Sequence, residues 1–174
     1  MEERYQELGF LDGKKRIDLK IVGTNSTEAY DNAGVPLCAS AYDPSQATPP
    51  IKKIVLKQMP GGAPYGVIEH QPYSAAGFYA SFYINSANGK PEKTLCSRSA
   101  LQGENIMVTD RNDHVLFTLI GKGNGNYTIK NMQNQNQGTI TKNRNVYLVA
   151  FADMLTNVTL KHGIISALIA SEFK

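Results

Sequence analysis

Apolar and polar residues alternate in short runs along the first 151 residues, and most runs end at turn-forming residues. Ile17, Leu19 and Ile21 are separated by charged residues, the two-residue period of a strand with one buried face. The Asp12-Gly13 pair just before them predicts an opening hairpin. Further strands are predicted at residues 35–42, 53–58, 65–70, 78–84, 93–97, 105–109, 114–119, 127–131, 138–142 and 146–151.

The segment from residue 157 onward follows a different pattern and is predicted to form a helix. It begins at Asn157, a residue type that caps helices, and contains no turn signal. Its apolar residues would cover nearly the whole circumference of that helix, so the helix must be buried on all sides. The run is shorter than the roughly 20 residues that span a bilayer. The predicted central-helix residues are Val158, Leu160, Ile164, Ile165, Leu168, Ile169 and Phe173.

Together the two patterns predict a mainly β fold, a closed antiparallel barrel of about twelve short strands around a central apolar C-terminal helix. An all-β structure can enclose such a helix completely only by wrapping around it. The 15 glycines and 8 prolines agree with many turns. Since no linker or shift in composition divides the chain, residues 1–174 are predicted to form a single domain.

The charge of the chain permits an anionic partner without requiring one, because the formal net charge is only +3. Basic residues nevertheless gather at two places, where they could contact lipid headgroups, each contact contributing about 1 kcal/mol near a charged membrane. The alternative is that they are solvated strand edges guarded by lysine. The candidate headgroup-binding residues are Lys14, Lys15, Arg16 and Lys20 in the first cluster, and Lys52, Lys53 and Lys57 in the second.

No set of residues with the spacing of a catalytic or metal site can be identified, so we predict a non-enzymatic protein without cofactor or metal. The three histidines and two cysteines are not at metal-ligand spacing. The loop at residues 110–113 lacks the glycine and glutamate of a calcium-binding loop. The glycine-rich segment 121–125 precedes a predicted strand, whereas a phosphate-binding loop precedes a helix.

The C-terminal region resembles that of phospholipid scramblases. In that family an aromatic-x-apolar-x-Phe strand is followed by Asp-Leu, then by a Val-x-x-Lys start to a helix that ends in an acidic residue and Phe. Residues 106–119 resemble the strand–turn–strand unit of the wider tubby C-terminal-like superfamily, which includes LURP-one-related proteins. The residues that match the scramblase pattern are Tyr147, Val149, Phe151, Asp153, Met154, Val158, Lys161, Ala167, Ile169, Glu172 and Phe173.

This resemblance covers mainly the C-terminal 70 residues and implies a twelve-stranded barrel around a central hydrophobic helix. The chain lacks the Cys-rich cluster of scramblases, and residues 143–146 lack the acidic residues of their proposed calcium segment. Calcium-dependent scrambling is therefore not expected. No pair of basic residues aligns with the phosphoinositide site of tubby.

The function predicted from these observations is that of a non-enzymatic binding or adaptor domain, associated peripherally with anionic phospholipids or phosphoinositides. A protein partner is a second option, and nucleic acid is not expected. The alternatives are a lipocalin-like carrier of a small apolar ligand and a structural or host-interaction protein that presents its loops. Because the sequence shows neither a secretory signal nor a transmembrane segment, the expected location is the cytoplasm, with peripheral association at a membrane.

Overall fold

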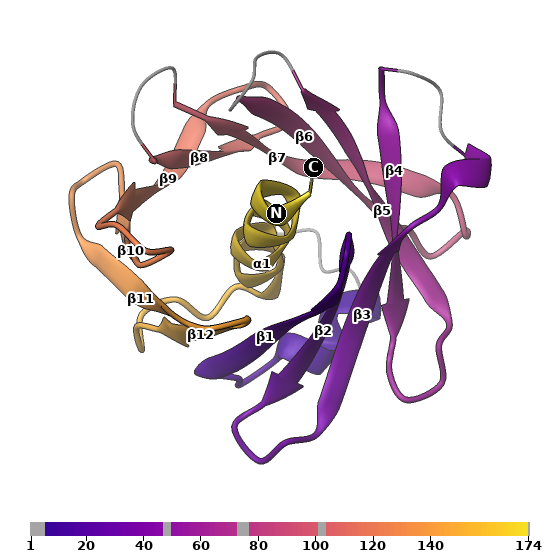
Figure 1. The fold of residues 1–174 in the computed structure, drawn as a ribbon, viewed down its shortest axis with the longest axis horizontal. Helices are drawn as coiled ribbons and strands as arrows, with labels where there is room; N and C mark the ends of the chain where they lie inside the picture. The colour runs from indigo at the N-terminus through magenta and orange to yellow at the C-terminus, as the bar shows by residue number, and fades with distance from the viewer. Residues whose placement is uncertain (1–5, 47–49, 73–76, 101–103, 174) are drawn as a thin grey trace.

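The computed structural model describes residues 6–46, 50–72, 77–100 and 104–173, and within them twelve antiparallel strands form a closed barrel (Figure 1). The strands follow one another around the barrel in chain order, and β1 pairs with β12 to close it. The predicted barrel is thus confirmed. The strands are β1 (Arg16–Gly23), β2 (Ser26–Asp31), β3 (Pro36–Tyr42), β4 (Lys52–Gln58), β5 (Pro64–Pro72), β6 (Phe78–Asn85), β7 (Pro91–Ser99), β8 (Ile106–Asp110), β9 (Val115–Gly121), β10 (Tyr127–Asn131), β11 (Asn136–Asn143) and β12 (Val146–Phe151).

The inward face of the barrel is largely apolar, as the alternation in the sequence predicts. Phe82 and Ile84 of β6 point inward and are fully buried. At the seam that closes the barrel, Ile17 of β1 lies opposite Val149 of β12, and both are fully buried. Burial of this apolar surface is the main favourable contribution to folding.

The helix α1 (Val158–Glu172) runs through the interior of the barrel, and every residue from Lys161 to Ala170 is buried. Its N-cap is Asn157, whose side-chain oxygen accepts a hydrogen bond from the amide of Leu160 at 3.1 Å. Of the predicted central-helix residues, Val158 and Leu160 in the first turn are half-buried. The others, Ile164, Ile165, Leu168, Ile169 and Phe173, belong to the core.

Within the barrel α1 packs mainly against one side, formed by β5 to β8. A Cβ on Gly163 would lie 2.5 Å from Cδ1 of Leu95 in β7, so the glycine allows the helix to approach this wall closely. On the other side, the inward side chains of β2 and β3 include the small residues Thr27, Ala29 and Ser40. These side chains reach less far into the barrel and leave more space beside the helix.

The predicted opening hairpin is wrong, because a 3-10 helix, η1 (Gln6–Leu11), precedes β1. Its residues Leu8 and Leu11 are fully buried, and the ring of Phe10 packs edge-on against Tyr65 at 5.5 Å. Two apolar residues three positions apart fit one face of a short helix better than a strand. A second 3-10 helix, η2 (Pro44–Gln46), follows β3.

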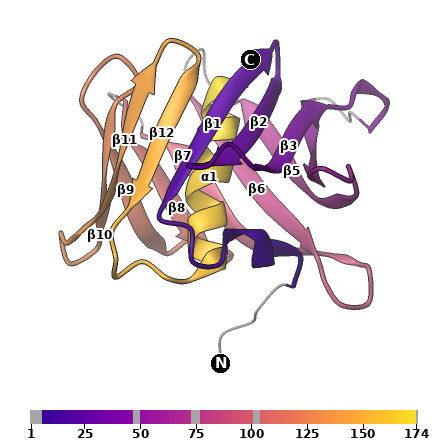
Figure 2. The same ribbon diagram turned by 90° about the horizontal axis from the view of Figure 1, so that it is seen from below.

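The two ends of the barrel differ, and we call them the base and the mouth. The base is the end at which α1 begins, and the mouth is the end at which α1 finishes; Figure 2 shows the base below and the mouth above. The base carries η1, the β2–β3 and β10–β11 turns and the segment that joins β12 to α1. The mouth carries the β1–β2 and β11–β12 turns. In the described ranges no helix combines the length and apolarity needed to cross a membrane.

Candidate functional site

The two predicted basic clusters do not form one surface. Lys14, Lys15 and Arg16 lie at the base, where the backbone oxygen of Lys14 accepts a hydrogen bond from Lys161 near the start of α1. Lys52 lies at the mouth, with its Nζ 5.5 Å from the ring centre of Phe173. The 15 residues of α1 that separate the two ends span about 22 Å.

The direction of the strands sets where the remaining predicted basic residues lie between the base and the mouth. Lys53 is next to Lys52 near the mouth, whereas Lys57 lies at the other end of β4, near the base. Lys20 is exposed on β1 between the two ends, opposite Glu28 of β2. The two clusters therefore do not lie on one flat surface that could contact a membrane.

At the base, Lys14 is held in an internal ion pair. Its Nζ lies 3.2 Å from Oδ2 of Asp31, a mostly buried carboxylate. The other oxygen of Asp31 accepts hydrogen bonds from the amides of Val35 and Ala33, both at 2.9 Å. The bond from Val35 is the largest cause of the lowered pKa of Asp31, and Lys14 adds to it. Lys14 thus fixes the β2–β3 turn and contributes little free charge.

Lys15 and Arg16 remain accessible. Lys15 pairs with Asp153 at 3.0 Å, but the two side chains are 74% and 87% exposed. Arg16 pairs with Asp18 on the same strand at 3.0 Å, and its side chain is 49% exposed. Exposed pairs of this kind contribute about 0–1 kcal/mol, so either cation could exchange its carboxylate for a lipid phosphate.

The base also exposes apolar side chains. Four large hydrophobic residues are exposed in the described part of the chain, and Val35, Met132 and Met154 of these lie at the base; the fourth, Val22, lies near the mouth. Strands β3, β2, β1, β12, β11 and β10 are consecutive neighbours, so their connections form one continuous stretch of the rim. We call Val35, Lys14, Lys15, Arg16, Met154 and Met132 the base arc. The site residues predicted from the sequence include none of its three apolar members. Met132 and Met154 lie between predicted elements, where an apolar residue is a usable signal, whereas Val35 begins a predicted strand.

Behind the base arc, Lys161 is buried inside the barrel. Its Nζ donates a hydrogen bond to the backbone oxygen of Lys14 at 2.6 Å and lies 5.4 Å from the ring centre of Phe151. Burial lowers the pKa of Lys161. The backbone and ring contacts compensate part of the cost of desolvating the ammonium group. Lys161 therefore anchors the segment before β1 to the start of α1.

His162 is the centre of a buried polar network. The Tyr65 hydroxyl and Nε2 of His162 are 2.8 Å apart, and the Ser166 hydroxyl and Nδ1 are 3.2 Å apart. Burial lowers the pKa of His162 to about 3, so the ring is neutral, with one nitrogen donating and the other accepting. Serine beside histidine could suggest a nucleophile, but both side chains are enclosed by the barrel. Within the described ranges, no group of three or more metal-binding side chains occurs.

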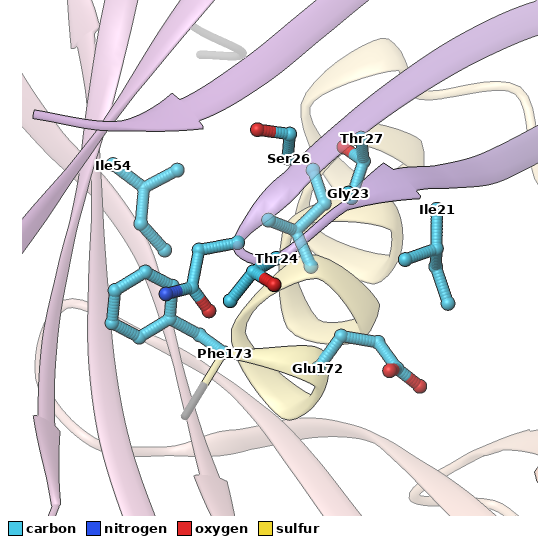
Figure 3. Close-up of a pocket in the computed structure, with 10 residues that line it drawn as sticks. Ile21, Gly23, Thr24, Ser26, Thr27, Ile54, Glu172 and Phe173 are labelled. Atoms are coloured by element: carbon cyan, nitrogen blue, oxygen red, sulfur yellow. The ribbon is translucent and has the colours of Figure 1, made fainter.

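The mouth contains a pocket of about 300 Å³ between the β1–β2 hairpin, β4 and the last turn of α1 (Figure 3). The Phe173 ring and the Glu172 carboxylate diverge from the end of α1 on its two sides. Oε1 of Glu172 accepts hydrogen bonds from Nζ of Lys142, at 3.1 Å, and from the Tyr147 hydroxyl. The lining residues are Ile21, Gly23, Thr24, Asn25, Ser26, Thr27, Ile54, Ile169, Glu172 and Phe173.

Comparisons with known proteins show a solved structure with the same fold. No protein-family model and no curated protein matches this chain. Among solved structures, the X-ray structure of the Arabidopsis thaliana protein AT5G01750 is similar, with a TM-score of 0.62. The alignment covers 92% of this chain and 93% of the plant protein, at 12% sequence identity. At this identity the likeness shows the shared fold alone.

Proposed function

We propose that this protein is a non-enzymatic binding domain that docks peripherally on anionic phospholipid membranes through the base arc. The observation that carries the proposal is that exposed apolar side chains occur together with Lys15 and Arg16 on one rim. Peripheral binding combines burial of apolar surface with attraction to anionic headgroups, and the base arc offers both. We also propose membership of the tubby C-terminal-like superfamily, supported by the C-terminal sequence motif and the barrel around a central helix.

The base is favoured over the mouth because three of the four exposed large hydrophobic residues in the described ranges are located there. Met132 and Met154 are 64% and 58% exposed. Methionine is flexible and apolar, which suits insertion among lipid headgroups and acyl chains. Exposed apolar groups contribute roughly 25 cal/mol for each Å² that leaves water, so partial insertion of two methionines adds to the charge attraction.

The charge contribution is modest, and this shapes the expected binding. Lys14 is committed to Asp31, which leaves Lys15 and Arg16 as the available cations of the base arc. Two cations contribute about 2 kcal/mol at low salt, and this part is screened as the ionic strength rises. The apolar part should persist, so binding should weaken with salt without disappearing.

Liposome co-sedimentation tests the proposal with phosphatidylcholine vesicles, alone or mixed with phosphatidylserine or a phosphoinositide. The native protein should bind the anionic vesicles and leave the neutral ones mostly free. Lys15→Glu with Arg16→Glu should weaken the binding by about 25-fold or more, since each lost contact is worth a factor of about five. Met132→Ser with Met154→Ser should weaken it in high salt as well as in low salt.

Matched controls are available at the mouth. Lys122→Glu with Arg144→Glu makes the same change of charge at exposed positions of that end, and Val22→Ser removes an exposed apolar side chain there. Both controls should bind vesicles like the native protein. Equal binding to neutral and anionic vesicles at low salt would remove the lipid assignment, and loss of binding in the mouth variants alone would move the docking surface to the other end.

A further inference from the structure

We infer that the pocket at the mouth is a binding site for a small uncharged organic molecule with an apolar ring or short chain and a hydroxyl group. This site is about 22 Å from the base arc along α1, and the inference does not depend on membrane docking. A volume of about 300 Å³ lies at the lower limit of known ligand pockets. It equals the space of about ten water molecules in the liquid.

The pocket follows from how the barrel is filled. α1 packs mainly against β5 to β8, and the inward residue Thr27 of β2, which lines the pocket, is too small to fill the other side. The hydroxyl groups of Thr27 and Ser40 satisfy each other at 2.6 Å, so this wall needs no contact from the helix. Thr27 lines the pocket, so a larger side chain at this position of β2 would close part of the space.

The β1–β2 hairpin is shaped around the opening of the pocket. Ile21 pairs with Thr27 and Gly23 pairs with Ser26, so Val22 is an extra residue in β1. Such a bulge bends the strand, and bulges are frequent at barrel rims and beside functional sites. Here the bulge coincides with the pocket wall, because both Ile21 and Gly23 line it.

The lining defines the chemistry of the occupant. Ile54, Ile169 and Phe173 provide apolar surface, while Thr24 and Ser26 bring hydroxyl groups to the hairpin side. The Phe173 ring is fixed by an edge contact with Tyr42 at 5.3 Å and by Lys52 on the ring, so it forms a firm wall.

Glu172 is the single charged residue of this lining, and Lys142 already balances it at 3.1 Å. A charged ligand would lose its hydration without gaining an unpaired counter-charge. An uncharged ligand avoids this loss and can hydrogen-bond to the hydroxyl groups. The occupant is therefore expected to be neutral.

A series of three probes of similar size and different charge tests this inference. Benzyl alcohol, benzoate and benzylammonium are each titrated into ¹⁵N-labelled protein, and amide shifts are followed by NMR. Benzyl alcohol should cause saturable shifts in residues 21–27 and 169–173, with benzoate and benzylammonium about tenfold weaker or worse. Equal or tighter binding of either charged probe, shifts confined to other regions, or no saturable shift would overturn the proposal.

Blocking variants locate the site independently. A Cβ on Gly23 meets nothing within 4 Å, so Gly23→Phe can place a ring in the pocket and should abolish the benzyl alcohol shifts. Gly9→Phe is the matched control, because Gly9 is also open but lies in η1 at the base. Thr24→Trp, at the exposed hairpin tip, is a second blocking variant should Gly23→Phe not fold. Undiminished binding in the folded blocking variants would refute the site.

Discussion

Two buried histidines occupy an interior that is otherwise mostly hydrocarbon. His162 is bonded to Tyr65 and Ser166, whereas His70 is stacked on Phe78 at 5.5 Å and contacts Phe173. Burial lowers the pKa of both rings, to about 3 for His162 and, with help from the charge of Lys52, to about 4 for His70. Both rings are therefore neutral in the folded protein at neutral pH.

The protein should lose stability as the pH falls below about 6.5. Unfolded histidine binds a proton near that value, but folded His162 does so only near 3. Protons therefore favour the unfolded chain between these values, by about 1.4 kcal/mol per pH unit for one such group. Urea unfolding followed by circular dichroism at about pH 7, 6 and 5 measures this slope.

Two histidine variants assign that slope. His162→Gln should reduce the slope, whatever it does to the stability at neutral pH, because the titrating group is gone. His70→Gln should reduce the slope for the same reason, because burial also lowers the pKa of His70. An unfolding free energy that stays constant between about pH 7 and pH 5 would contradict the neutral buried ring.

At the scale of single elements, α1 carries the largest share of the core. Each buried Ile or Leu on it contributes roughly 1.5–3 kcal/mol. A chain that ends before Val158 should therefore lose cooperative folding, as measured by calorimetry and by size-exclusion chromatography. A truncated chain that stays monomeric and unfolds cooperatively would refute the role of α1.

A milder change in the same element provides a graded comparison. Asn157→Ala removes the side-chain acceptor for the amide of Leu160, and should cost about 1 kcal/mol while leaving the fold intact. Thr156→Ala, at the exposed neighbouring position, should change the free energy of unfolding by less than about 0.5 kcal/mol. Urea titrations of both variants measure the difference.

Elements whose apolar pattern in the sequence matches their burial in the structure were predicted, and elements without such a pattern were missed. α1 and the inward face of β6 were predicted because continuous or alternating apolar residues report directly on burial. β2 was not predicted, since its inward positions are Thr27, Ala29 and Asp31, which give no apolar period. Thr27, one of these residues, also lines the pocket, so the missed strand and the missed pocket share part of their physical cause.

The basic residues were recognised in the sequence, but their grouping was not. Lys52 and Lys57 are five positions apart and look like one cluster, yet an extended strand places them near opposite ends of the barrel. In the sequence, nothing distinguishes Lys14 from Lys15. Lys14 pairs with Asp31 only because β1 and β2 lie side by side in the barrel. Sequence spacing cannot show either effect without strand direction and register.

For the whole molecule, the separation of the two ends implies that they act independently. Gly23→Phe should leave vesicle binding unchanged, and Lys15→Glu with Arg16→Glu should leave the benzyl alcohol shifts unchanged. Co-sedimentation and NMR on both sets of variants check this. If blocking the mouth altered vesicle binding, the two sites would be energetically coupled, and the coupling would act in both directions.

The seam between β1 and β12 has a consequence for how the chain is made. Residues 16–20 can pair with residues 146–150 only after the ribosome has released nearly all of the strands, and α1 follows later still. Until then the apolar inward face of the strands is exposed to water, and contacts between residues so distant along the chain form slowly. Newly synthesised chains should therefore depend on chaperones during this interval. At high expression levels, aggregation should compete with closure of the barrel.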